Sequence, residues 1–358
     1  MRALCVLTAC LALLLPSSGV ADTYTVDPSD PDLLHGLWYW CGPMDTIQML
    51  PGTYVVGQPA GYWPLHLSSD SPALVGVGGP EGVILLGTGV EQPFYLSQFT
   101  YPDAHIHFER LTFGGLAEII GREDPISGDG GVLHFTDNIV EDCGTGPLYP
   151  PLNATACGGI IARNTFRNNS GPAIVIYHTS AAIEDNDIYG NGDGIKDWCC
   201  TSPPMRRNHI HDNLGTGIAT GYYEGGVIDS NVIERNGGTG LAVGSHFTVQ
   251  HNVIRENARG VSSGGISGSY AAIHYNDIYD NAEFNLRAAS DYEQTQDCTM
   301  NWWGSVDPLV IAEGIQDCYD DPELRVCVVF EPFCMSPGCE PTPVESSSWG
   351  SIKALYRR

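Results

Sequence analysis

The segment at residues 194–198, GIKDW, holds the residue types best suited to chemistry. Lys196 is the only lysine before Lys353, and a lysine acts as a general base when its surroundings lower its pKa. Trp198 offers an aromatic face on which a sugar ring can pack. The predicted catalytic residues are Lys196, His178 and Glu224, and the predicted substrate-binding residues are Tyr177, Asp197, Trp198, Tyr222 and Tyr223. A competing interpretation is that Lys196 is a solvated charge and the tyrosines cover the ends of short strands.

Metal ligands are harder to assemble from the sequence. His209 and His211 flank Ile210, so both face outward on a strand, but no third ligand is visible beside them. We therefore predict no metal site and no cofactor. Calcium stays an unproven alternative at two acidic loops, residues 27–32 and 317–323, because neither has the spacing of a calcium-binding loop.

The charge of the chain limits its partners. The formal net charge is −26, and no basic stripe exists to neutralise phosphates, so nucleic acid is excluded as a partner. A polyanionic sugar would also be repelled unless cations screen it.

A repeat with a period near 22 residues must position these side chains. Asparagines recur at spacings of 26, 22, 22, 23, 21 and 24 residues. An apolar residue lies three before and two after each asparagine, and another asparagine, or Cys143, lies five after it. Such self-similarity indicates a stacked repeat fold. The aligned asparagines are Asn138, Asn164, Asn186, Asn208, Asn231, Asn252 and Asn276.

The units are too short for helices of ordinary length, so each predicts short strands joined by tight turns. One unit then forms one winding of a coil, and windings stack at about 4.8 Å as neighbouring parallel strands. The isoleucines face inward, and the asparagine amides hydrogen-bond along the stack in a structural ladder. Strand alternation directs Lys196 outward and Asp197 inward. Because an inward aspartate is costly, either the strand breaks at Asp197 or Asp197 has a special role.

The pattern N-x-[IVF]-x-x-N followed by G-[ILV] resembles the right-handed parallel β-helix family, the pectin-lyase-like superfamily with its carbohydrate-binding and sugar-hydrolase repeats. The segments at 45–56, 73–85 and 108–115 are similar to its early windings, and NWWG at 301–304 is similar to the closing segment of exported bacterial members. The resemblance covers residues 23–335 and implies an all-β, right-handed parallel β-helix of about ten rungs. The family contains lyases, hydrolases, epimerases and proteins without known activity, so the resemblance does not assign a reaction.

Signature residues of the family's enzymes are missing. The sequence lacks the clustered aspartates and following arginine of calcium-dependent pectate lyases. It also lacks the paired aspartates, Gly-His-Gly and Arg-Ile-Lys of the polygalacturonase-like hydrolases. Whether the protein is an enzyme is therefore left open.

Both ends of a solenoid need caps. Residues 31–41 predict a short helix whose Leu34, Trp38 and Trp40 cover the first rung, and Asp307-Pro308 predicts a second helix start. Cysteines cluster near the C-terminus, which predicts a disulfide-rich cap. Sequence proximity suggests three bonds: Cys143 with Cys157, Cys298 with Cys318, and Cys334 with Cys339.

The first 21 residues read as a signal peptide cleaved near Ala21, with lipid attachment at Cys10 as the alternative. The predicted domains are a β-helix at 22–295, a cysteine-rich cap at 296–339, and a linker with a tail at 340–358 that has a sorting role or is a frayed terminus. No later segment is apolar for long enough to span a membrane.

We predict a secreted or cell-surface monomer, a rigid module that contacts an extracellular polysaccharide or cell-surface glycan. The alternatives are a polysaccharide lyase or glycoside hydrolase, and a structural or adhesin-like rod without a ligand cleft.

Overall fold

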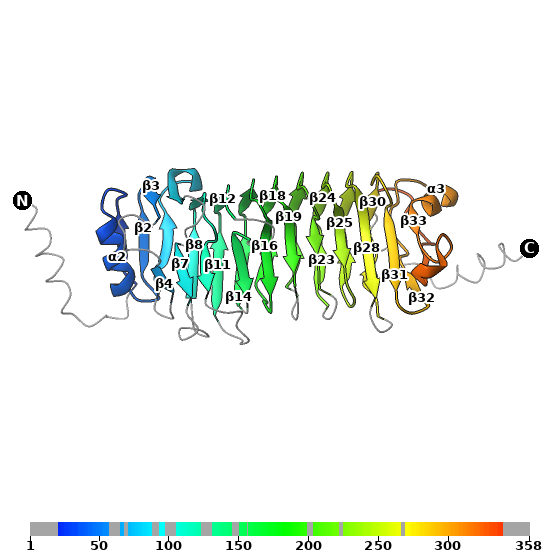
Figure 1. Cartoon of the computed structure of the whole chain (residues 1–358), viewed down its shortest axis with the longest axis horizontal. Coiled ribbons are helices and arrows are strands. Elements are labelled where there is room, and N and C mark those ends of the chain that lie inside the picture. The colour runs from blue at the N-terminus through cyan, green and yellow to red at the C-terminus, as the bar shows by residue number, and fades with distance from the viewer. Residues whose placement is uncertain are drawn as a thin grey trace, which may run out of the picture.

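The chain coils into a rod of stacked parallel strands, seen in the computed structural model (Figure 1). The structure describes residues 21–56, 65–67, 71–87, 93–96, 105–122, 131–144, 150–155, 157–198, 203–221, 225–265 and 269–338. Strands that are neighbours in a sheet come from successive windings, so every sheet runs along the rod. The predicted parallel coil of about ten rungs is confirmed.

The first sheet has eleven strands, and from β11 onward each lies just before a ladder asparagine. In stacking order they are β1 Thr23–Val26, β2 Thr46–Met49, β5 Ala73–Gly76, β8 His105–Glu109, β11 Val132–Thr136, β14 Gly158–Ala162, β17 Ala182–Glu184, β20 Met205–Arg206, β23 Val227–Asp229, β26 Thr248–Gln250 and β29 Ala272–Ile273.

The second sheet has ten strands, and from β12 onward each strand directly follows a ladder asparagine. They are β3 Gly52–Val55, β6 Val83–Leu86, β9 Thr112–Gly114, β12 Ile139–Glu141, β15 Thr165–Arg167, β18 Asp187–Tyr189, β21 His209–His211, β24 Val232–Glu234, β27 Val253–Arg255 and β30 Asp277–Tyr279.

The third sheet has eight strands and carries Lys196. They are β13 Leu152–Thr155, β16 Pro172–Tyr177, β19 Asp193–Asp197, β22 Ile218–Ala219, β25 Thr239–Val243, β28 Arg259–Gly265, β31 Leu286–Ser290 and β33 Ile315–Gln316. A smaller sheet joins β4 Leu65–Leu67, β7 Phe94–Leu96 and β10 Ile120–Arg122, and a pair joins β32 Gln294–Asp297 to β34 Val326–Val329.

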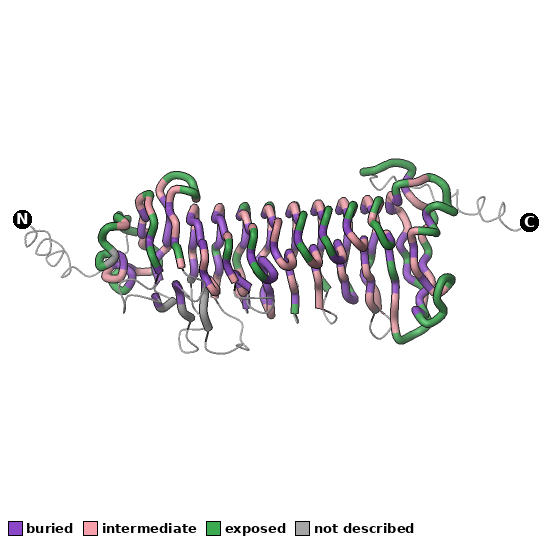
Figure 2. Tube along the Cα trace, turned by 45° about the horizontal axis from the view of Figure 1, so that its top comes forward, coloured by how far each residue is buried: buried purple, intermediate pink, exposed green. Residues whose placement is uncertain are grey.

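Strand register places like residues directly over one another. Ile188 pairs with Ile210, and Ile210 with Ile233, and all three are fully buried. The third apolar column stacks in the same way: Ile174 pairs with Ile195, and Ile195 pairs with Ile218. Figure 2 shows buried positions recurring along the windings, with exposed segments gathered at both ends of the rod. The core is therefore a set of continuous columns, as the repeat predicts.

The asparagine ladder is also confirmed. Asn186 donates its backbone N–H (3.1 Å) and its Nδ2 (2.9 Å) to Oδ1 of Asn208, one winding on. Its Nδ2 also donates to the carbonyl of Ile161 on the previous winding at 2.9 Å. The same bonds recur at every step from Asn164 to Asn276, and the ladder extends to Asn301. Each of these buried amides thus hydrogen-bonds its own winding to the windings on either side.

A second ladder runs five residues further along each winding, from Asn169 to Asn281. Cys143 occupies its first position: its thiol accepts from the backbone N–H of Leu116 and lies 3.4 Å from the carbonyl of Phe113. The Cys143 thiol therefore occupies the position that an asparagine amide occupies in later windings.

The N-terminal cap is helix α2, Pro31–Trp40, with Asp30 as its N-cap. Leu34 and Trp38 are buried against the first windings, as predicted. Trp40 is 59% exposed, so its predicted contact with the first rung is wrong. It lies at the last helical position, just before the chain turns into extended backbone at Cys41.

The C-terminal end has helix α3, Pro308–Glu313, whose first turn is capped by the Asp307 side chain, as predicted. Short 3₁₀ turns lie at Pro80–Gly82 and Pro322–Leu324. No helix among the described residues is both long and apolar enough to cross a membrane.

Two predicted disulfides are wrong. Cys318 bonds Cys327 across a turn, with the two Cα atoms 4.9 Å apart, while Cys298 is a thiol packed in the core. Cys143 is also a thiol, because its side chain fills the ladder position described above. Cys334 is disulfide-bonded, and its predicted partner Cys339 lies outside the described residues. Among the described residues, Cys318–Cys327 is the bond of the C-terminal cap for which both partners are seen.

Candidate functional site

Lys196 lies on the outward side of the eight-stranded sheet, between Val175 and Ala219 of the adjacent windings. Its Nζ lies 5.4 Å from the centroid of the Trp198 ring, two residues on along the same face. Trp198 is 54% exposed. A cation over an exposed indole makes a flat amphipathic platform, with the ring as its apolar part.

Asp197 resolves the two alternatives left open by the sequence. Strand β19 runs through it, paired with Ile176, and the N–H of Trp198 continues the ladder to the Ile176 carbonyl at 3.0 Å. The strand does not break, and Asp197 is buried on the inward side. A carboxylate that points inward cannot touch a ligand on the platform, so its predicted substrate contact does not fit this geometry.

The other predicted residues divide into two groups. Tyr177 ends the neighbouring strand β16 and is partly buried, and the His178 ring meets it edge-on with centroids 4.6 Å apart. His178 adopts a left-handed backbone (φ 51°) just beyond the strand. No hydrogen bond or ion pair joins His178 to Lys196 in the described part of the chain. Tyr222, Tyr223 and Glu224 lie outside the described residues.

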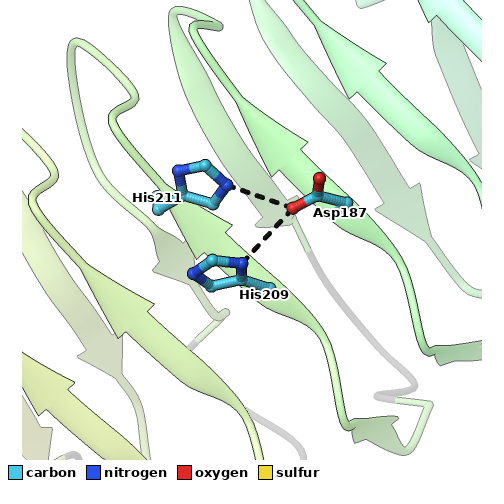
Figure 3. Close-up of side chains that lie close together, drawn as sticks. All are labelled: Asp187, His209 and His211. Carbon is cyan, nitrogen blue, oxygen red and sulfur yellow. Dashed lines mark hydrogen bonds and ion pairs between the residues drawn. The ribbon is translucent and has the colours of Figure 1, made fainter.

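A second cluster lies on the outward side of the ten-stranded sheet (Figure 3). The paired strands β18 and β21 bring Asp187 beside His209, which lies next to His211. The Oδ1 of Asp187 is 3.1 Å from Nε2 of His211 and 3.4 Å from Nδ1 of His209. The two imidazoles stack with centroids 4.0 Å apart, which confirms that both face outward together.

Carboxylates also approach the far sides of both rings. Nδ1 of His211 lies 2.6 Å from Asp212, and Nε2 of His209 lies 3.3 Å from Glu234. Burial raises the pKa of Glu234, but hydrogen bonds from Arg255, Arg235 and His209 outweigh it and lower that pKa to about 2. Glu234 is therefore a fixed negative charge at neutral pH.

The sequence pattern missed Asp187 as a neighbour of the histidines. The signal was present, because Asp187 precedes His209 by the 22-residue period and so occupies the same column one winding earlier. Reading the columns across windings, rather than along one strand, would have found the third ligand-type side chain.

The acidic loops are engaged in local turns. Asp27 accepts hydrogen bonds from the backbone N–H and the hydroxyl of Ser29, which lower its pKa. Asp317 accepts from the N–H groups of Tyr319 and Val328. Because these carboxylate oxygens already accept hydrogen bonds within their own loops, the loops are only weakly compatible with calcium binding.

Comparison with known proteins fixes the fold class. Residues 152–296 match the family model described as a right handed beta helix region. The A-module of mannuronan C-5 epimerase AlgE4 from Azotobacter vinelandii superposes with a TM-score of 0.52 over 89% of this chain and 96% of that chain, at 14% identity. The chain is a right-handed parallel β-helix.

Two further solved structures are similar in outline. A mannuronic acid specific polysaccharide family 6 lyase from human gut microbiota gives a TM-score of 0.41 at 15% identity, covering 87% of this chain and 92% of that chain. The A-module of the A. vinelandii mannuronan C-5 epimerase AlgE6 gives 0.42 at 14% identity, covering 92% and 90%. No curated protein matches the sequence. At these identities the likeness shows the fold alone.

Proposed function

We propose that this β-helix is an exported module that binds an extracellular polysaccharide on the platform formed by Tyr177, Lys196 and Trp198. The observation that carries the proposal is the exposed Trp198 ring with the Lys196 ammonium over it. Sugar rings present apolar faces that pack on an indole, and a neighbouring cation can donate hydrogen bonds to hydroxyl or carboxylate oxygens.

Binding fits this face better than catalysis. A lyase or hydrolase needs acid and base groups that converge on one bond. No carboxylate among the described residues forms an ion pair with Lys196, and Asp197 is directed into the core. The AlgE4 module shares the fold, and its name assigns it to mannuronan, so the scaffold is compatible with a polysaccharide partner.

The charge of the chain narrows the ligand class. At a net charge of −26, a uronate chain is repelled unless cations screen the pair, so we expect neutral polysaccharides to bind more tightly. The signal-like N-terminus supports export to the cell surface or medium, and the basic last segment supports a sorting role for residues 340–358. Unchanged export after deletion of those residues would contradict the sorting role.

The test is a binding screen against immobilised neutral and uronate polysaccharides, with and without calcium. We expect Trp198→Ala to weaken binding about tenfold, the loss of one buried aromatic contact. Trp40→Ala is the matched control, since Trp40 is similarly exposed but lies on the N-terminal cap. Equal losses in both variants, or no binding to any polysaccharide, would refute the platform.

The same screen separates binding from catalysis. Unsaturated or reducing ends that appear with wild type and vanish with Lys196→Ala would show that the enzyme alternative is right and the binding module wrong.

A further inference from the structure

Asp187, His209 and His211 lie together for reasons that the coil imposes. All three project from the outer side of the ten-stranded sheet, two from one strand and one from its neighbour (Figure 3). Strand alternation fixes His209 and His211 on one face, and the 22-residue winding brings Asp187 into register beside them. The cluster therefore rests on regular sheet rather than on a loop.

The distances suit a small divalent cation. One oxygen of Asp187 and one nitrogen of each histidine lie within 4.8 Å of one another. A tetrahedral site with bonds of 2.0–2.1 Å separates neighbouring ligand atoms by about 3.3 Å. The oxygen-to-nitrogen distances here are 3.1 Å and 3.4 Å, so two edges of that tetrahedron are already formed.

The hydrogen-bond roles of the imidazoles give a second, independent argument. Each ring has a carboxylate oxygen near both nitrogens: Asp187 on one side, and Asp212 or Glu234 on the other. A neutral imidazole can donate from only one nitrogen. A metal bound between the rings and Asp187 would leave each outer N–H to donate to its carboxylate, the arrangement typical of metal-bound histidines.

The outer carboxylates are themselves held in place. Arg235 donates a hydrogen bond to Asp212 at 3.1 Å, and Arg255 donates one to Glu234 at 2.8 Å. These contacts orient the groups that would orient the histidines.

We propose that Asp187 Oδ1, His209 Nδ1 and His211 Nε2 bind one Zn²⁺ ion and leave its fourth position open to solvent. Two imidazoles and one carboxylate suit zinc, whereas calcium takes oxygen ligands almost throughout. The side chains of Asp187 and His209 are 47% and 44% exposed, so the open position faces outward. An oxygen of a bound molecule could take that position.

The test uses the full secreted chain, stripped with a chelator and titrated calorimetrically with Zn²⁺. We expect one equivalent to bind wild type, with at least tenfold weaker binding in Asp187→Asn, His209→Gln and His211→Gln. Zn²⁺ should also raise the melting temperature of wild type, because it binds the native state only, and should not do so in the three variants. Circular dichroism checks that each variant folds.

The matched control is His251→Gln, because His251 pairs with Asp229 at 2.9 Å without a second histidine. It should bind Zn²⁺ as wild type does. Co²⁺ provides a probe of wild type alone: absorption typical of nitrogen and oxygen ligands supports the site, and thiolate charge-transfer bands overturn it. Absence of micromolar binding in wild type, or equal binding in all variants, also overturns the proposal.

Discussion

At the scale of single residues, the buried asparagines hold the molecule together. The amide oxygen of Asn208 accepts two hydrogen bonds from Asn186 on the previous winding. Its Nδ2 donates to the Ile183 carbonyl on that winding and to Oδ1 of Asn231 on the next, so this buried amide is fully paired. The sequence predicted these columns because the amide must recur once per winding. The alignment also placed Cys143 in the second asparagine column, but its proximity to Cys157 along the chain led to a disulfide prediction, which its free thiol in the ladder contradicts.

Asn208→Ala tests the ladder. The change removes the acceptor for two bonds from Asn186 and the donor to Ile183 O, all in buried surroundings. We expect the free energy of unfolding to fall by about 2–4 kcal/mol, measured by urea denaturation. Asn168→Gly is the control: Asn168 is exposed and has a φ of 57°, which glycine accepts, so its loss should change stability little.

The Cys143 thiol predicts a pH dependence. Burial raises its pKa to about 12, above the unfolded value of about 8.5. The unfolded state therefore loses its proton first, and the stability present below pH 8.5 declines as the pH rises toward 12. Urea denaturation between pH 8 and 10 should show a shallower decline in Cys143→Ser than in wild type, by at most about 1.4 kcal/mol per pH unit. Identical slopes would contradict this account.

At the scale of elements, strand alternation decided what the sequence could predict. It correctly directed Lys196, His209 and His211 outward and Asp197 inward, because strand parity is a local property. Pairing between windings is not local. The sequence therefore missed the partnership of Asp187 with the histidines, and proximity along the chain gave two wrong disulfides.

Ile210 tests the packing of the strand columns. It is fully buried between Ile188 and Ile233, so Ile210→Ala should destabilise the fold by about 2–5 kcal/mol and Ile210→Val by about 0.5–1.5. Val232→Ala, at an outward position of the adjacent strand, should cost less than about 1 kcal/mol. Comparable losses at Ile210 and Val232 would mean that the inward columns are not the core.

At the scale of the whole molecule, the rod is a one-dimensional stack in which each winding contacts mainly its neighbours. Such a scaffold can present separate sites on separate faces. The Lys196 platform and the Asp187–His209–His211 cluster lie on different sheets of the same region of the coil. Loops between windings can vary without disturbing either, because register is held by the ladders.

Removal of one whole winding tests this independence. Deleting residues 232–252 joins Asn231 to Val253 in the place that Asn252 held, so both ladders and all columns stay in register. We expect a folded protein whose melting midpoint is within about 10 °C of wild type by circular dichroism. Deleting only residues 232–241 leaves a partial winding and should prevent cooperative melting. A folded protein from both deletions would contradict the role of register.

The most direct test of the stacked coil is hydrogen exchange at the backbone amides of the ladder asparagines, followed by NMR along the rod. These amides lie between strands, and their only described acceptors are the side chains one winding away, at 2.9–3.1 Å from Asn164 through Asn252. We predict that they exchange as slowly as the central strands. Exchange at the rate of an open turn would contradict the ladder, and with it the placement of every outward side chain described above.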